Sequence, residues 1–129
     1  MGYWGTGILE NDGATGYLCS YFDLYDEGKE HLKIREELEA FFLEHGWTTY
    51  EDWLYLAYCQ WKCGFFDGEV LKKVEEIIVS GIDRQSWMEG QASQKDIEIR
   101  KNKLNNFYKK LQIPNERPLK RGTWSARRL

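Results

Sequence analysis

The spacing of apolar residues constrains this chain most, because it repeats with the period of an α-helix over most of the length. Between Asn11 and Gly28 the apolar residues stand three or four positions apart, at Ala14, Leu18, Tyr21, Phe22 and Tyr25. Such a pattern is typical of a helix with one buried side, and Asn11 and Asp12 are suited to cap it. The spacing predicts a first helix from Asn11-Asp12 to near Gly28.

Similar stripes follow along the chain and predict four or five further helices. The stripes are formed by Ile34, Leu38, Phe41 and Phe42; by Trp53, Leu54, Ala57 and Trp61; by Val70, Leu71, Val74, Ile77 and Ile78; and by Ile97, Leu104, Phe107, Tyr108 and Leu111. Between the last two stripes, a short turn or helix runs from Asp83 through Trp87. The segment TTYEDWLYLAYCQWKCG has few polar residues, so we expect its helix to be central and buried on most sides.

Residues that favour helix ends separate the stripes. Thr49, followed three positions later by Asp52, forms a loose capping box, and Asp67 can cap the fourth helix. Gly46 and Gly64 follow the second and third stripes, where a glycine can take the left-handed conformation that ends a helix.

These features predict an all-α protein. At 129 residues the chain is long enough for one domain with a hydrophobic core. We expect a single-domain bundle of five or six helices over residues 1–113, which includes a Gly/Trp-rich N-terminal segment. Residues 114–129 contain both prolines and form a basic tail, which is either flexible or extended and partly anchored through Trp124.

The opening MGYWGTGILEND combines glycines with large apolar side chains. We expect Trp4 and Ile8 to hold the terminus in the core, while Gly5 and Gly7 let the backbone bend. A phosphate-binding loop is disfavoured here because no strand precedes the glycines and no P-loop lysine follows them. Six tryptophans are many for this length, and we expect them to form the rigid framework of the core, with an interface as a further role.

Soft metal ligands are few in this chain. Cys59 and Cys63 stand four residues apart on one predicted helix, whereas Cys19, His31 and His45 are scattered. A structural zinc site needs four ligands, so we expect reduced, mostly buried thiols, no metal and no cofactor.

A small enzyme is an alternative interpretation. It would require a polar trio, such as Glu10 and Asp12 with His31 or His45, to converge on a pocket. No run of about 18 apolar residues is present, and the N-terminus lacks a basic region followed by an apolar stretch. We therefore expect a cytoplasmic protein without a membrane span or signal peptide.

Charge is distributed unevenly along the chain, although the net charge is only −3. Residues 1–93 carry 7 Lys/Arg against 18 Asp/Glu, a net −11, while residues 94–129 carry 11 against 3, a net +8. Either the basic C-terminal helix folds back onto an acidic body, or the acidic surface attracts a basic partner.

The basic residues also leave a nucleic-acid-associated regulator as an alternative. The segment Lys95–Lys110 and the tail could contact phosphates, with Trp124 available for stacking. The tail cations are Arg117, Lys120, Arg121, Arg127 and Arg128. The acidic net charge disfavours this interpretation.

Several motifs follow one another along the chain. The first is M-G-x-W-G-x-G, continued by Asn11-Asp12 and Ala14, and the second is W-L-x-L-A-x-x-Q-W-K-x-G-x-x-D over residues 53–67. The third is I-I-x-x-G-x-D-x-x-x-W over residues 77–87. A basic helix and a Pro-basic end follow, with Arg100, Lys101, Leu104, Leu111, Pro114, Pro118, Lys120 and Arg121.

Together these motifs resemble a widespread family of small bacterial proteins, and they cover most of the chain outside about residues 26–48. Two positions depart from the family pattern, since Gly16 and Tyr58 stand where many relatives have acidic residues. The resemblance implies structural roles for Trp4, Gly5, Gly7, Asn11, Asp12, Trp53, Gln60, Trp61, Gly81, Asp83 and Trp87.

The family has no established enzymatic activity, so the resemblance does not imply an enzyme. Some relatives are similar to immunity proteins encoded beside secreted toxins. The resemblance therefore implies a bacterial immunity protein that binds and neutralises a toxin, presumed basic, of a contact-dependent or other secreted system. The residues expected to bind the toxin are Asp23, Asp26, Glu27, Glu30, Glu36, Glu37 and Glu39, because most of them lie where the family is matched least and because acids suit a basic partner. A solvated helix face is the alternative for these acids.

Overall fold

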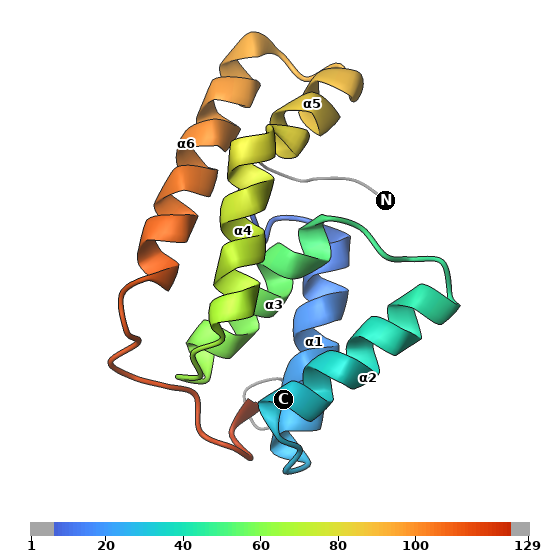
Figure 1. Ribbon diagram of the computed structural model, residues 1–129, viewed down its shortest axis with the longest axis vertical. Coiled ribbons are helices and arrows are strands. Elements are labelled where there is room, and N and C mark those ends of the chain that lie inside the picture. Colours follow the sequence, from blue (N-terminus) through green and yellow to red (C-terminus); the bar gives the residue numbers. More distant parts are fainter. Residues whose placement is uncertain (1–6, 125–129) are drawn as a thin grey trace.

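The apolar stripes fold into helices, as Figure 1 shows for the computed structural model, which describes residues 7–124. The helices in this part of the chain are α1 (Asp12–Asp26), α2 (His31–Glu44), α3 (Glu51–Lys62), α4 (Gly68–Ser80), α5 (Ile82–Glu89) and α6 (Gln94–Leu111). No strand occurs among the described residues, so the prediction of an all-α bundle of five or six helices is confirmed. Trp4 and Gly5 lie outside the described residues.

Two of the predicted helix caps form. The Asn11 side chain accepts a hydrogen bond from the Ala14 N–H at 2.8 Å and begins α1. The Asp67 carboxylate accepts one from the Val70 N–H at 3.4 Å and begins α4. Each side chain satisfies a backbone donor that the helix itself cannot pair.

The predicted cap at Thr49 is wrong. α3 begins at Glu51, and Tyr50 precedes it with a helical backbone and no capping hydrogen bond from its side chain. The Thr49 N–H donates to the Asp52 carboxylate at 3.1 Å, so only the acidic half of the box forms. The first turn of α3 thus carries the carboxylates of Glu51 and Asp52 beside its positive N-terminal end.

α3 lies at the centre of the bundle, as predicted. It packs against α1 and α4 and also contacts α6, and most of its residues are buried. α6 packs against α4 and α5, whereas α2 packs chiefly against α1. Figure 1 accordingly shows α2 and α6 at opposite edges of the molecule.

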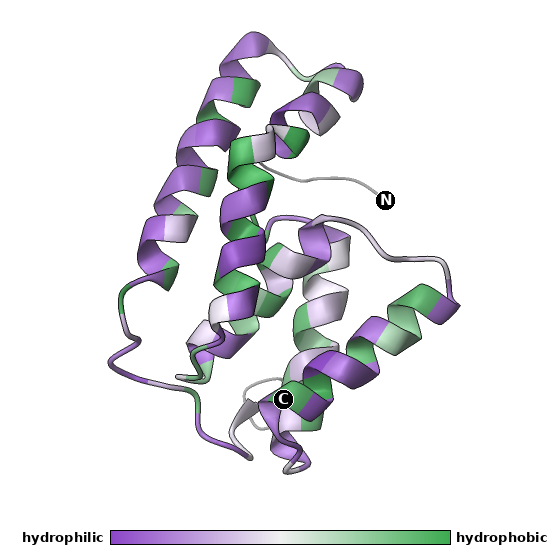
Figure 2. Cartoon of the chain, in the orientation of Figure 1, coloured by the Kyte–Doolittle hydropathy of each residue, from purple (hydrophilic) through white to green (hydrophobic). Residues whose placement is uncertain are grey.

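α2 is only shallowly embedded in the bundle. It buries Ile34 and Leu38, and Phe42 packs against the core. Phe41 is 45% exposed, so its assignment to the buried stripe is wrong. A single main helix neighbour covers a narrow strip of α2, and Figure 2 shows apolar and hydrophilic segments alternating along it.

The five tryptophans within residues 7–124 do not form the framework of the core. Trp47 is 56% exposed, and Trp53, Trp61, Trp87 and Trp124 are only partly buried. The buried core consists instead of tyrosine, leucine, isoleucine and valine side chains with Phe22 and a few smaller ones.

The partly buried indoles separate this core from the charged surface. Arg35 and Lys73 lie 5.3 and 5.5 Å from the ring of Trp53, and Lys110 lies 4.8 Å from that of Trp61. A cation gains electrostatic attraction from the face of an indole, which explains why these rings lie at the edge of the core.

The segment after α6 returns across the ends of α1 and α3. The Leu119 N–H donates to the Lys62 carbonyl and the Tyr25 hydroxyl donates to the Leu119 carbonyl, each at 2.8 Å. Leu119 is buried, and the ring of Trp124 lies 4.6 Å from that of Phe22. Residues up to 124 therefore pack on the bundle, while Arg127 and Arg128 lie outside the described residues.

Alanine at Gly64 is expected to lower the free energy of unfolding by about 2–3 kcal/mol. Gly64 has a φ of +76°, and an added Cβ would lie 2.9 Å from the Cβ of Pro118. The variant therefore carries a left-handed backbone penalty of about 1 kcal/mol and an additional steric penalty. Urea denaturation measures the loss.

Gly46 provides the matched control for this substitution. It occupies the equivalent position after α2 with a φ of +70°, and an added Cβ would meet nothing within 4 Å. Gly46→Ala should cost only the backbone penalty, about 1 kcal/mol. Equal losses in the two variants would show that the contact with Pro118 does not matter to stability.

Candidate functional site

A buried arginine joins three helices. Arg100 of α6 is 1% exposed, and it donates from Nε and Nη2 to the two carboxylate oxygens of Asp83 in α5 at 2.9 and 2.8 Å. It also donates from Nη1 to the Gly7 carbonyl at 3.1 Å, and Nη2 lies 3.5 Å from a carboxylate oxygen of Glu51. Burial disfavours the cation, but the hydrogen bonds of Asp83 and the charges of Asp83 and Glu51 outweigh it and raise the pKa of Arg100.

Tyrosines extend this network to α1. The Tyr50 hydroxyl donates to Asp83 at 2.7 Å, and the Tyr55 hydroxyl lies 3.0 Å from the Asn11 side chain and 3.2 Å from Glu51. Residues from separate sequence motifs therefore meet at Arg100, and their polar groups bind one another. The arrangement holds the bundle together, in agreement with a structural role for Asn11 and Asp83.

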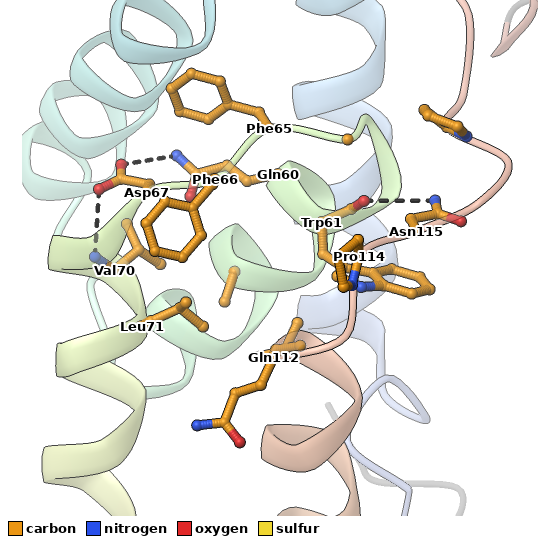
Figure 3. Close-up of a pocket in the computed structure, with 14 residues that line it drawn as sticks. Gln60, Trp61, Phe65, Phe66, Asp67, Val70, Leu71, Gln112, Pro114 and Asn115 are labelled. Carbon is orange, nitrogen blue, oxygen red and sulfur yellow. Dashed lines mark hydrogen bonds between the residues drawn. The ribbon is translucent and has the colours of Figure 1, made fainter.

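A hollow of about 210 Å³ lies where α3 ends, α4 begins and the segment after α6 passes (Figure 3). Phe66 and Trp61 contribute to its apolar lining. Asp67 lies at its edge and accepts hydrogen bonds from the Gln60 side chain at 3.0 Å and from the Val70 N–H. Arg35 lies 3.2 Å from the same carboxylate. Asp67 thus serves the fold, and the remaining surface of the hollow is largely apolar.

The candidate catalytic trio with His31 does not assemble. Nδ1 of His31 lies 2.7 Å from the Tyr21 hydroxyl, near the C-terminal end of α1. Asp12 lies at the opposite end of α1, about 13 Å away for nine residues of helix. Glu10 lies 4.0 Å from Lys103.

The other soft ligands are separated as well. His45 stacks on Trp47 with a ring distance of 4.7 Å, while Cys59 and Cys63 are buried, free thiols. Burial raises the pKa of Cys63 to about 12 and keeps that thiol neutral. Within residues 7–124, no group of three or more His, Cys, Asp or Glu side chains could hold a metal ion.

The acids expected to bind a partner fall into two groups. Asp26 accepts a hydrogen bond from the Gly122 N–H at 2.8 Å, and Glu37 binds Lys29 through both carboxylate oxygens at 2.8 Å. Asp23, like these two, is partly buried. The exposed members are Glu27, Glu30, Glu36 and Glu39, on α2 and at the turn before it. These exposed carboxylates are the ones that a partner can reach directly.

A larger hollow of about 570 Å³ opens between α1, the end of α2 and the start of α3, and none of these acids lines it. We call it the α1–α2 groove. Its lining consists of Asn11, Asp12, Gly13, Gly16, Tyr17, Ser20, Phe41, Phe42, Gly46, Trp47, Thr48, Thr49, Glu51, Asp52 and Tyr55.

Aromatic rings form one wall of the α1–α2 groove. Phe41 packs edge-on against Phe42 and Trp47, with ring distances of 5.7 and 5.9 Å. Phe42 in turn stacks on the buried Tyr17 at 5.4 Å. The wall therefore runs from the core to solvent, where Phe41 and Trp47 are 45% and 56% exposed. Such rigid, partly exposed aromatic side chains are common at the energetic centre of protein interfaces.

Carboxylates also line the groove. Asp12 lies in the first turn of α1, and Glu51 and Asp52 lie in the first turn of α3. Burial raises the pKa of Asp52, although a backbone hydrogen bond from Thr49 opposes the shift. Among the described residues that line the groove, none is a lysine or an arginine.

Glycine at position 16 leaves the groove open. A Cβ added there would meet nothing within 4 Å, so packing does not require a glycine in this helical turn. A glycine inside a helix costs about 0.5–1 kcal/mol relative to alanine. Gly13 is different, because its added Cβ would lie 3.2 Å from the Asn11 side chain.

Sequence reasoning missed most of this groove. Phe41 was assigned to the core and Trp47 to the framework of tryptophans, because helical spacing does not show that α2 has one main neighbour. The run FFLEHGW over residues 41–47 could have indicated the groove. It contains more apolar side chains than one narrow strip of a helix can bury, so some of them must be exposed. Gly16 also lines the groove. The sequence showed it only as a position that departs from the family pattern.

Comparison with known proteins adds no relative to this picture: no family model, no curated protein and no solved structure matches the chain. No helix within residues 7–124 is long and apolar enough to cross a lipid bilayer.

Proposed function

We propose that this chain is a binding protein that neutralises a basic protein by direct contact, in the manner of a bacterial immunity protein bound to its toxin. The observation that carries the proposal is the α1–α2 groove, in which exposed aromatic rings lie beside carboxylates. Phe41 and Trp47 supply rigid anchors, and Asp12, Glu51 and Asp52 line the same groove.

The distribution of charge supports a basic partner. Residues 10–52 carry 12 Asp/Glu against 3 Lys/Arg, a net −9. The basic helix α6 packs against α4 and α5 at the opposite edge of the molecule from α2 (Figure 1). Two of its cations, Arg100 and Lys103, face acids of the body, but α6 does not cover α2. An uncovered acidic surface accelerates encounter with a cationic protein.

The proposed mechanism needs little rearrangement of the chain. The exposed carboxylates of Glu36 and Glu39 attract the partner, and the aromatic wall then fixes the docked complex. Neutralisation follows because the bound chain covers the partner's active site or blocks the approach of its substrate.

Co-expression with the product of the adjacent gene tests the proposal. We expect growth to be restored when that product is toxic alone, and a one-to-one complex to elute in size-exclusion chromatography with light scattering. In stopped-flow mixing at low salt, Glu36→Lys combined with Glu39→Lys should slow association at least tenfold. Asp26 is avoided in this design because it holds Gly122.

Glu89→Lys combined with Glu98→Lys is the matched control. It makes the same change in charge at exposed positions of α5 and α6, away from α2. The control should leave the association rate within about twofold. Absence of toxicity and of a complex would refute the proposed function, and equal slowing by both pairs would refute the role of α2 in steering.

A further inference from the structure

We propose that the α1–α2 groove receives one lysine- or arginine-bearing segment of the basic partner, with the side-chain stem on the aromatic wall and the cationic end between Asp12 and Asp52. This inference rests on the proposed function and identifies the part of the surface that recognises the partner. Three properties of the groove support it: its open floor, its aromatic wall and its charge.

The floor of the groove admits a chain segment. At about 570 Å³, the space is of the size that accommodates several side chains or a short peptide. Gly16 adds no side chain to this floor, and the space above it is open. A glycine weakens α1, and packing does not require one at position 16. The absence of a side chain there keeps the groove accessible.

The aromatic wall suits a long cationic side chain better than a compact apolar one. Lysine and arginine lay their methylene stems along apolar surface and keep the charge at its edge. Phe41 and Trp47 provide that surface, and the faces of their rings attract a cation. The same chain already pairs cations with indoles, at Trp53 and Trp61.

The charge of the groove suits a cation. Asp12, Glu51 and Asp52 contribute three negative charges. Arg100 binds Asp83 more closely than Glu51 and so offsets Glu51 only in part, while the N-terminal ends of α1 and α3 offset about half a charge each. About one to two negative charges remain, which a single cation offsets at least in part. Burial raises the pKa of Asp52, and the charge of Glu51 adds to the shift, so a cation bound beside Asp52 would favour its charged form.

A titration with two small peptides tests the groove without the whole partner. The probes are the blocked peptide acetyl-Leu-Arg-Leu-amide and its citrulline counterpart, which keeps the shape of arginine and loses the charge. With the full chain labelled with ¹⁵N, we expect the arginine peptide to shift the signals of Gly13, Gly16 and the Trp47 indole. The citrulline peptide should bind at least tenfold more weakly.

Gly16→Leu provides the decisive variant, because it fills the groove at a position where a larger side chain has room and where leucine favours the helix. It should weaken binding of the arginine peptide at least tenfold. Thr15→Leu places the same side chain on the neighbouring exposed position outside the groove and should change binding less than twofold.

The outcomes separate this inference from the proposed function. Shifts confined to the region of Glu27 and Glu30, equal binding of the two peptides, or unchanged binding by Gly16→Leu would overturn the groove as the cation site. Rescue of growth by Gly16→Leu at the level of the unmodified chain would also overturn it, while leaving the proposed function intact. Peptide binding in the groove without any growth rescue would refute the proposed function alone.

Discussion

Replacement of Asp83 by alanine is expected to lower the free energy of unfolding by about 3–5 kcal/mol, the loss typical when one partner of a buried ion pair is removed. Arg100 is 1% exposed and directs two hydrogen bonds to the Asp83 carboxylate. Its guanidinium remains charged in the variant, so a buried cation loses its strongest acceptor. Tyr50 loses its acceptor at the same time. Urea denaturation followed by circular dichroism measures the change.

The double variant Asp83→Ala with Arg100→Met separates the ion pair from general damage. We expect it to be more stable than the sum of the single losses predicts, with a coupling of about 0.5–3 kcal/mol, because no buried cation is left to be compensated. Glu89→Ala is the control on the same helix, since Glu89 is exposed, and it should change stability by no more than about 0.5 kcal/mol. Similar losses from Asp83→Ala and Glu89→Ala would show that the network does not hold the bundle.

The positions of the helices follow from local properties of the sequence. Apolar spacing located five of the six, while α5 was expected only as a short turn or helix, and Asn11 and Asp67 marked the start of two of them. A helix depends on neighbours three or four residues away. The predicted cap at Thr49 is wrong because a capping box requires a particular backbone conformation, and the sequence pattern does not determine that conformation.

The Arg100 network depends on contacts between distant segments. Arg100 lies 17 residues from Asp83 and 49 from Glu51. Its spacing from Ile97 and Leu104 places it on the buried side of α6, but that spacing does not show which acids it binds. The motifs indicated that Asp83 is structural, but only the packing of α5 against α6 shows what it binds.

The groove escaped prediction for a related reason. Whether Phe41 is buried depends on how many helices surround α2, which is a property of the assembled bundle. The predicted acids rest on charge and on their place in the stretch that the family pattern matches least, and the structure divides them, since Asp26 and Glu37 have partners within the chain. Charge patterning therefore indicated the acidic side of the molecule, and the geometry adds which carboxylates are exposed there.

Replacement of Ile34 by alanine is expected to lower the free energy of unfolding by about 2–5 kcal/mol, as for other large-to-small changes in a core. Ile34 is fully buried, and together with Leu38 it forms the buried strip of α2. Because α2 packs chiefly against α1, few other contacts remain to hold it after the cavity is made. Leu32→Ala is the matched control, because Leu32 is 60% exposed and its loss should cost no more than about 0.5 kcal/mol.

The location of the damage distinguishes two ways in which Ile34→Ala can act. Because α2 has one main helix neighbour and α3 has several, amide hydrogen exchange should accelerate more in α2 than in α3. Phe41 and Phe42 would then leave the groove while the remaining helices stay folded, so binding of a partner should fall by more than the global stability implies. Equal acceleration in α2 and α3 would contradict this, and would mean that the aromatic wall is as stable as the centre of the bundle.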